Sequence, residues 1–481
     1  MKMRGKTNSI RLGLEILTPV QCGSGQEMFR ELDYVEKEKQ VFVVDQPQSF
    51  NTIASSDTQL DTLLTGSSKL SDLVILAGEH FGYALPVLSG SNHKVPDRFK
   101  AHLKDAMFRP YIAGSAIKGA IRTALIADFI RNLLQANDQP QILLKGKLPN
   151  KPVNPKFAFQ ILQKELIGKE PNQDIFRALH VKDAIFTAKE LCLADIRWLN
   201  LTGLPSKEIA SWRNMSNKKN LVKWQEASGV YAEMLKPHSL TSFELQWDDF
   251  LLSNTKAWNA NQTAVNILPI NFEGLKAKLN QHALYRLENE IAFYKKYGVL
   301  ATQKECELLQ QKIAQDDSNA YLQLSWGSGW RGMTGDWLPV ELAAEMRTLF
   351  KLGKPNMPFP KTRRLAVSGE PKLPLGWVCL VQYQQVEEKI NQQQAAKIAK
   401  DNRCAWVDSQ ISQLMKKNKC QANDALRGGG LAQAWQNLEE SDLKQQALED
   451  IKNRWQKENW WDEPNGRAAK QAKAIYQANT Q

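Results

Sequence analysis

Cysteine and histidine are scarce, with six of each in 481 residues, and neither residue type forms a cluster. Structural zinc sites and disulfide frameworks need closely spaced ligands or a dense set of cysteines. The sequence has no C-x-x-C pair, and no histidine stands at metal-ligand spacing from the six cysteines, which are Cys22, Cys192, Cys306, Cys379, Cys404 and Cys420. We therefore expect no metal, no cofactor and no disulfide framework.

Long apolar runs are also missing. No stretch approaches the roughly 20 residues needed to cross a bilayer, and the opening MKMRGKTNSI lacks the apolar core of a signal peptide. These absences predict a cytoplasmic protein. The hydrophobic content of 42% and the charged content of 24% are typical of a globular protein, and the length predicts two or three domains.

Motifs for catalysis are lacking as well. The sequence contains no P-loop, no recognisable pair of catalytic carboxylates and no nucleophile elbow. A metal-independent ribonuclease needs a histidine or tyrosine and a lysine near the scissile phosphate, but the pattern places none of His93, His102 and His238 in such a site. We therefore assign no catalytic residue.

Positive charge is in excess. Lysine and arginine number 63 against 51 aspartate and glutamate residues, which gives a net charge of +12 and a pI near 9.2. This balance favours a polyanionic partner, and nucleic acid is the leading candidate. A basic surface that only maintains solubility is the alternative that charge alone leaves open.

The segment Met107–Arg131 combines the end of a strand, a turn and the start of a basic helix. We expect Gly114 to adopt backbone angles that other residues resist, and Ser115 to cap the helix. Lys118 and Arg122 are four residues apart, so they share one side of the first helical turns, where unpaired N–H groups favour an anion. The segment predicts a phosphate-binding corner, with a plain turn and a solvated helix edge as the alternative.

The same helix is expected to have a glycine on its binding side and an apolar stripe toward the core. Gly119 lies between the two cations, where it lets a phosphodiester approach closely. The apolar positions follow helical spacing and comprise Ile117, Ala120, Ile121, Ala124, Leu125 and Phe129.

Two glycine loops follow strand-like runs elsewhere in the chain. The first, Gly23-Ser24-Gly25, comes after the alternating strand at Ile10–Ile16, and its glycines can expose backbone N–H groups to a phosphate. The second runs from Trp326 to Gly335 after a strand at Tyr321–Ser325, and its four glycines in nine residues predict a loop rather than a helix. Its candidate RNA-binding residues are Gly327, Ser328, Gly329, Trp330 and Arg331.

Side chains in and after the second loop suit single-stranded RNA. Arg331 could pair with a phosphate in a bidentate way, and Trp326 or Trp330 could stack on a base. Tryptophans that only pack in the core are the alternative. Three more cations, Lys361, Arg363 and Arg364, follow Pro360 and extend the candidate site.

Periodicity predicts an α+β protein in three parts. A hairpin in Tyr34–Asp45 followed by helices has the β-then-α order of a ferredoxin-like, RRM-like unit, and Val230–Leu235 with Ser242–Trp247 predicts another hairpin. Asp33 is interpreted as the start of the first hairpin and not as a catalytic group. We place an N-terminal domain with insertions at 1–250, a second domain with the glycine-rich loop at 251–385, and a helical extension at 386–481.

These motifs resemble the RAMP superfamily of CRISPR effector complexes. The resemblance rests on G-S-x-x-K-G-x-x-R at 114–122, on the early strand with its T-P and glycine loop, and on the later glycine loop. The order of glycine loop, helix, P-K-T-R-R and P-L-G-W is similar to one RAMP subtype, the fifth subunit of the type III-A (Csm) complex. The resemblance covers residues 8–384.

The resemblance implies a fold of two RAMP domains and a function in antiviral defence. Such subunits are non-catalytic parts of a ribonucleoprotein that bind crRNA, cap its 3′ end, contact the adjacent backbone RAMP subunit and support crRNA maturation, with a host nuclease as a further partner. Two other classes stay open: a RAMP-family endoribonuclease that processes crRNA, and a generic single-stranded RNA-binding protein.

Overall fold

The computed structural model divides into two compact units, Met1–Val386 and Glu387–Gln481. His93 and Gly335, which the sequence analysis names, lie outside the residues that the structure describes. The structure describes residues 7–478 except for 38–39, 66–68, 79–80, 89–94, 136–163, 165–166, 169, 204–206, 215–219, 259, 261–263, 333–335, 337–346, 354–358, 389–403, 440, 458–459, 462–463 and 465.

A five-stranded antiparallel sheet is built around the first strand of the chain. Its strands lie in the order β15 (Ala320–Gln323), β18 (Trp377–Gln382), β1 (Thr7–Ile16), β14 (Leu240–Asp248) and β8 (Leu179–Val181). Every second side chain of β1 is buried at Leu12, Leu14 and Ile16, which confirms the alternation predicted for this strand. The segments before and after residue 250 therefore share one sheet.

A second, larger sheet contains eight strands. Its main path is β12 (Asn220–Leu221), β11 (Ile209–Arg213), β10 (Leu191–Thr202), β13 (Val230–Leu235), β6 (Arg98–His102) and β2 (Gly23–Phe29). β16 (Thr362–Ser368) also pairs with β10, and β17 (Glu370–Pro374) pairs with β16. This sheet likewise takes strands from both sides of residue 250.

The hairpin predicted from β13 and β14 is wrong, because these neighbouring strands join different sheets. β13 pairs with β10 and β6, whereas β14 pairs with β1 and β8. The connection is tied to the end of β1, where the N–H of His238 donates to the carbonyl of Ile16 at 2.7 Å. Each strand thus finds its own partners, and the turn between them links the two sheets.

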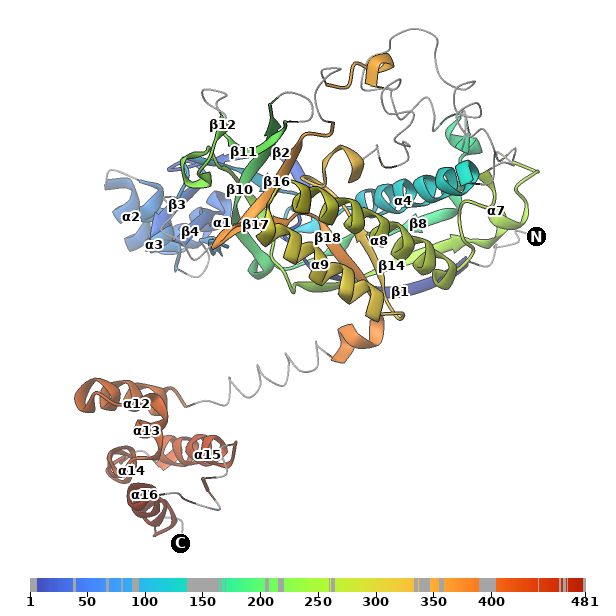
Figure 1. Cartoon of the computed structure of the whole chain (residues 1–481). Coiled ribbons are helices and arrows are strands. Elements are labelled where there is room, and N and C mark those ends of the chain that lie inside the picture. Colours follow the sequence, from blue (N-terminus) through green and yellow to red (C-terminus); the bar gives the residue numbers. More distant parts are fainter. Residues whose placement is uncertain are drawn as a thin grey trace. The chain divides into compact units, whose positions relative to one another are not determined.

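Three helices pack against the cores of the first unit. α4 (Gly114–Gln135) buries the apolar stripe predicted for it, with Ile117, Ile121 and Leu125 fully buried. α8 (Phe272–Lys296) was predicted as one long helix, and α9 (Leu300–Gln315) follows it after the turn at Gly298. α8 and α9 lie side by side in Figure 1, and their apolar faces share a core cluster with β15, β16 and β18.

A small α/β element follows β2 in the chain. Its sheet contains β3 (Tyr34–Lys37), β4 (Gln40–Val44) and β5 (Gly82–Leu85), and the β3–β4 hairpin was predicted. Asp33 accepts a hydrogen bond from the N–H of Phe29 at 2.8 Å, so its carboxylate holds the turn before β3. The helices of this element are α1 (Gln46–Ala54), α2 (Asp57–Thr65) and α3 (Leu70–Ala77). Other short elements of the first unit include β7 (Tyr111–Ile112), β9 (Ala184–Ile185) and α7 (Asp249–Ser253).

The second unit is helical, as the sequence predicts for the extension. Its described elements are α12 (Ala405–Asn418), α13 (Ala422–Arg427), α14 (Gly429–Gln436), α15 (Ser441–Lys457) and α16 (Arg467–Ala478). Trp435, Trp455 and Tyr476 meet in a core that contains residues of this unit alone. No helix in the described ranges is long and apolar enough to span a membrane.

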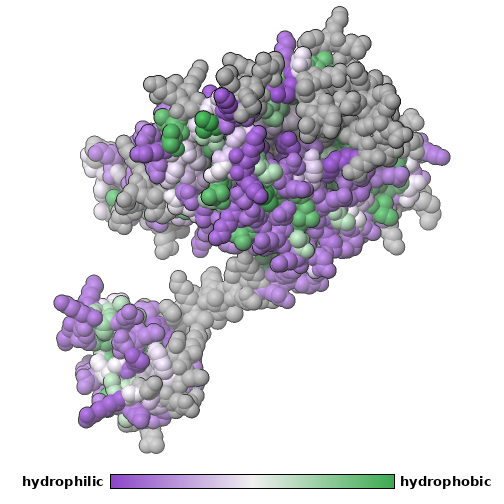
Figure 2. Space-filling view, in the orientation of Figure 1, coloured by the Kyte–Doolittle hydropathy of each residue, from purple (hydrophilic) through white to green (hydrophobic). Residues whose placement is uncertain are grey.

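Because each unit has its own core, the first should fold without the second. We expect a chain ending at Val386 to melt within about 2 °C of the corresponding transition of the full chain. Among the residues that are coloured in Figure 2, hydrophilic ones predominate on the visible face of each unit. Differential scanning calorimetry of both chains checks this prediction, and an aggregated or non-cooperative truncated chain would contradict it.

Candidate nucleic-acid interface

The α4 corner is held by a close backbone contact. A Cβ on Gly114 would lie 2.1 Å from the carbonyl oxygen of Val181, and the N–H of Gly114 donates to Asp183 Oδ1 at 2.6 Å. Gly114 lies in the helix, and its φ is not in the left-handed region. The expectation that Gly114 is needed for unusual backbone angles is therefore wrong, because the close approach of β8 is what requires glycine.

Ser115 does not cap the helix. The carbonyl of Ala113 accepts the first helical hydrogen bonds, from the N–H groups of Ala116 and Ile117, so Ala113 occupies the cap position. Asp183, from the β8–β9 connection, supplies the carboxylate at this helix start. The predicted cap is thus displaced by a partner distant in sequence.

Lys118 and Arg122 share one side of α4, but the structure gives them an acidic neighbour. Arg122 Nη2 lies 2.7 Å from Asp174 Oδ2, and its guanidinium lies 5.3 Å from the centre of the Phe176 ring. Burial lowers the pKa of Lys118, while Asp174 raises it and Arg122 lowers it further. Gly119 is exposed and has open space beside it. The two cations remain proposed RNA contacts, with part of their charge offset by Asp174.

The first glycine motif forms the start of an edge strand instead of a loop. Gly23, Ser24 and Gly25 begin β2, which lies next to β6 at the end of the described strand order of its sheet. The pairing register shifts between Gly23 and Glu27, and Gly25 has a φ of +86° with open space beside it. The glycines therefore form a bulge at a sheet edge, where backbone groups are accessible.

The three glycine motifs approach one another at Cys22. Its sulfur lies 3.0 Å from the hydroxyl of Ser325, and the N–H of Trp326 donates to the carbonyl of Gln21 at 3.1 Å. Burial raises the pKa of the Cys22 thiol, and hydrogen bonds with Ser325 and the Ala113 backbone lower it in part. The residues that immediately precede the three motifs are therefore neighbours in the fold.

The second glycine motif has two positions with left-handed backbone. Gly327 has a φ of +96°, and a Cβ there would lie 2.4 Å from Leu375 Cδ1, whereas Gly329 has a φ of +77° beside open space. Ser328 is buried, and its hydroxyl donates to the carbonyl of Ser325 at 2.9 Å. Residues 329–332 form a helical turn. The prediction that this segment contains no helix is therefore wrong for these four residues, because glycine disfavours a helix by only about 1 kcal/mol per residue and does not forbid a single turn.

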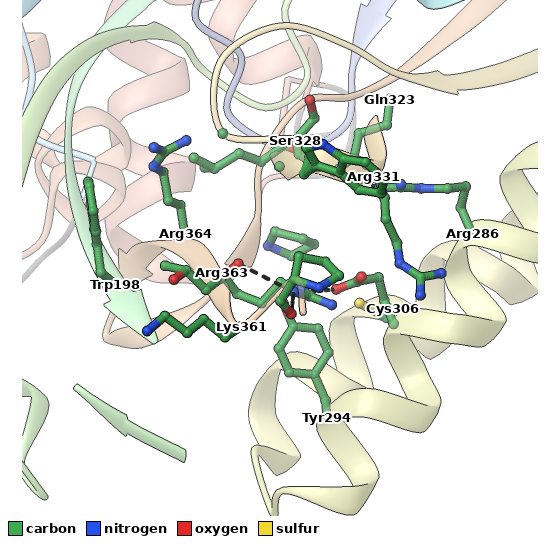
Figure 3. Close-up of a pocket in the computed structure, with 18 of the residues that line it drawn as sticks. Trp198, Arg286, Tyr294, Cys306, Gln323, Ser328, Arg331, Lys361, Arg363 and Arg364 are labelled. Carbon is green, nitrogen blue, oxygen red and sulfur yellow. Dashed lines mark hydrogen bonds and ion pairs between the residues drawn. The ribbon is translucent and has the colours of Figure 1, made fainter. Parts of the chain in front are cut away.

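A pocket of about 580 Å³ joins the second glycine motif to the basic segment after Pro360. Figure 3 shows Lys361, Arg364 and Trp198 on one side and Arg286 and Arg331 on the other. The lining includes eight predicted site residues, which are Gly327, Ser328, Gly329, Trp330, Arg331, Lys361, Arg363 and Arg364. The eight predicted residues of the other two motifs, from Gly23 to Gly25 and from Gly114 to Arg122, do not line it.

Three arginines of the pocket have acidic partners in the described part of the chain. Arg363 Nε donates to Glu290 Oε2 at 2.7 Å, and the two side chains are only 14% and 15% exposed. Arg331 and Arg286 lie 3.9 and 3.7 Å from Asp336 Oδ1. Burial raises the pKa of Asp336, although the arginines oppose this shift. Much of the charge on the α8 side of the pocket is therefore compensated.

Arg364 is held by aromatic rings, whereas the other three arginines of the pocket have carboxylate partners. Its guanidinium lies 4.9 Å from the ring centres of both Trp198 and Trp326. Among the described residues no carboxylate forms an ion pair with it, its Nε is buried without a hydrogen-bond partner, and burial lowers its pKa. The two tryptophan rings thus fix a cation whose N–H groups have no anionic partner in the described chain.

Sequence reasoning missed the residues that α8 and β10 contribute to the pocket. Arg286, Glu290 and Tyr294 follow His282 at intervals of four on α8, beside the leucine stripe that predicted the helix. This polar stripe was a usable signal, because residues four apart share one helix face. Trp198 had no comparable signal, since its role depends on the pairing of β10 with β16.

The structure also brings together His102, Tyr83 and Lys104, the residue types of a metal-independent ribonuclease. Their common partner is the fully buried Glu233, which accepts hydrogen bonds from the Tyr83 hydroxyl and the Lys104 ammonium. Burial lowers the pKa of His102 to about 4, and its ring Nε2 lies 3.2 Å from the carbonyl of Tyr111. We interpret this group as a buried structural network, because a phosphate could not reach the histidine.

Comparison with known families establishes the class of the protein. The family model described as the RAMP superfamily matches residues 14–293, more than half of the chain. The chain therefore belongs to the RAMP superfamily. No curated protein shows a significant match. Among the described residues, histidine, cysteine, aspartate and glutamate form no group of three or more that could hold a metal ion.

Two solved structures are similar to this chain. A chain of a Csm–crRNA–target RNA ternary complex from a type III-A CRISPR-Cas system is 22% identical, with a TM-score of 0.50, and the match covers 78% of this chain and 100% of that chain. Csm5 from T. onnurineus is 20% identical, with a TM-score of 0.47 and coverage of 76% and 99%. The family match and the first of these structures show an α+β, RAMP-like fold, and this chain adds a C-terminal helical region.

Proposed function

We propose that this protein is a non-catalytic crRNA-binding subunit of a type III-A CRISPR-Cas (Csm) ribonucleoprotein, where it caps the crRNA 3′ end. Membership of the RAMP superfamily and a fold shared with a whole chain of a Csm–crRNA–target RNA complex support this proposal. In this role the protein works in the cytoplasm, contacts the adjacent backbone RAMP subunit and supports crRNA maturation, with a host nuclease as a further partner.

The observation that carries the proposal is the convergence of two motifs on one pocket. The glycine motif at Gly327–Arg331 and the cations Lys361 and Arg364 come from segments about thirty residues apart, yet they line the same space. Aromatic rings stand among the cations. Cations beside aromatic surfaces suit single-stranded RNA, because phosphates pair with the cations and unstacked bases stack on the rings.

Incubation of the purified full chain with repeat-containing RNA separates this proposal from the endoribonuclease alternative. We expect the RNA to be bound and to remain uncut, since the group that combines a histidine, a tyrosine and a lysine surrounds the buried Glu233, and His102 in that group is itself buried. Sequence-specific cleavage by protein free of host nucleases would support the enzyme instead. Binding to RNA without incorporation into a reconstituted Csm complex would support the generic RNA-binding alternative.

Removal of Lys361 should weaken RNA binding in a salt-dependent manner. The Lys361→Gln variant should bind all single-stranded sequences less tightly, and the slope of log K against log salt should fall by about 0.7. Fluorescence anisotropy at several salt concentrations measures both quantities. The exposed Lys182, which pairs with Glu244 at 2.7 Å, provides the control variant Lys182→Gln. Equal slopes for wild type and Lys361→Gln would contradict this contact.

A further inference from the structure

We propose that the pocket between the second glycine motif and β16 holds a single unstacked nucleotide of the bound RNA, with its phosphate on Arg364. This inference rests on the proposed function, because it assigns a ligand to the same site. The volume of about 580 Å³ lies within the range of roughly 300–1,000 Å³ that is typical of small-ligand sites. An extended backbone crossing a flat surface would not need such an enclosed space.

The phosphate position follows from the distribution of charge. On the α8 side, Glu290 compensates Arg363 at 2.7 Å, and Asp336 lies between Arg286 and Arg331. On the opposite side, the described residues offer no carboxylate partner to Arg364 or to its neighbour Lys361. A phosphate therefore gains the most electrostatic stabilisation beside Arg364 and Lys361, because no described acidic group pairs with these two cations.

The two tryptophans beside Arg364 orient it for this role, and the arginine covers one ring face of each. A guanidinium 4.9 Å from both ring centres occupies one face of Trp198 and one face of Trp326. The N–H edge of the arginine is then left for an acceptor, and its buried Nε has no partner in the described chain. An arginine fixed in this way loses little side-chain entropy when it binds an anion.

The base position follows from the other aromatic pair in the pocket. Trp330 and Phe359 both line the pocket and meet edge to face, with ring centres 5.0 Å apart. Arg347 lies over the Phe359 ring at 5.3 Å, so we assign the base to Trp330. Trp330 lies in the helical turn at 329–332, beside Gly329, whose open surroundings let a base approach the ring.

Calorimetric titration of the full chain with AMP tests the pocket directly. We expect AMP to bind more tightly than inorganic phosphate, and Arg364→Gln to weaken AMP binding by about tenfold or more. Trp330→Leu should weaken AMP but not inorganic phosphate, since it removes only the stacking surface. Arg364→Lys should restore part of the affinity, and Lys182→Gln should bind AMP as the wild type does. Melting curves confirm that each variant is folded.

Competition with RNA separates the possible outcomes. Saturating AMP should raise the dissociation constant of a single-stranded RNA oligonucleotide, because both ligands use the pocket. If the wild type binds RNA but not AMP up to about 10 mM, or if Arg364→Gln binds AMP unchanged, the pocket assignment is wrong while the proposed function stands. AMP binding without any effect on RNA would identify a separate mononucleotide site and overturn the inference. Failure of the wild type to bind RNA at all would instead contradict the proposed function.

Discussion

The Gly114→Ala variant is expected to lose about 3 kcal/mol of folding free energy. The added Cβ would lie 2.1 Å from the carbonyl oxygen of Val181 and 3.0 Å from the carbonyl carbon of Lys182. Both contacts are with backbone, so no side-chain rotation can relieve them. The helix start would have to move away from Asp183, whose carboxylate accepts the N–H of Gly114. Urea denaturation followed by circular dichroism measures this loss.

The matched control is Gly119→Ala on the same helix. Gly119 is exposed, and a Cβ there would meet nothing within 4 Å. Alanine favours a helix interior over glycine, so this variant should gain about 0.5–1 kcal/mol. Equal stability of the two variants would contradict the packing described for the α4 corner. A Gly119→Ala protein that is more stable yet binds RNA less tightly would support the predicted approach of a phosphodiester at this residue.

The Glu290→Gln variant should lose about 3–5 kcal/mol, because it leaves the Arg363 charge buried without its counter-charge. The pair is 85% or more shielded from solvent on both sides, and its Nε–Oε2 distance is 2.7 Å. Arg363 also lies 4.1 Å from the centre of the Phe293 ring, so its position is fixed. The exposed Glu273 on the same helix, which is paired with Lys276, gives the control Glu273→Gln, for which we expect less than about 1 kcal/mol.

Stability at low pH provides a second measurement of the same pair. Burial alone would raise the pKa of Glu290, but the charge and hydrogen bond of Arg363 hold that pKa below its ordinary value. The stabilisation is therefore present at neutral pH, and it is lost as the pH falls through the lowered pKa of the folded state. Wild type should lose more stability between neutral and acidic pH than Glu290→Gln. If the free energies of unfolding of the two proteins changed in parallel with pH, the Glu290–Arg363 pair would not be the source of this pH dependence.

The elements that depend on local pattern could be predicted from the sequence. Alternation identified β1, and helical spacing identified α4 and α8. The glycine motif at 327–329 was recognised because left-handed backbone angles favour glycine, and Gly327 and Gly329 have such angles. The candidate site residues within these motifs could therefore be identified from the sequence.

Features that depend on contacts between distant segments could not be predicted in this way. Gly114 is needed because β8 passes close to it, and the separation of β13 from β14 depends on strands that lie far away in the chain. The compensation of Arg363 by Glu290 spans 73 residues. Which of several cations stays available for RNA is thus a property of the tertiary structure, although the cations themselves are visible in the sequence.

Cross-linking of a photoreactive single-stranded crRNA to the full chain, followed by mass spectrometry of the linked peptides, tests the central claim most directly. The claim is that RNA occupies the pocket between the second glycine motif and β16. We predict cross-links in the peptides that contain Trp330 and Lys361–Arg364, and their loss in Arg364→Gln. Cross-links confined to the second unit, Glu387–Gln481, or to surfaces outside the pocket and the α4 corner would contradict the account.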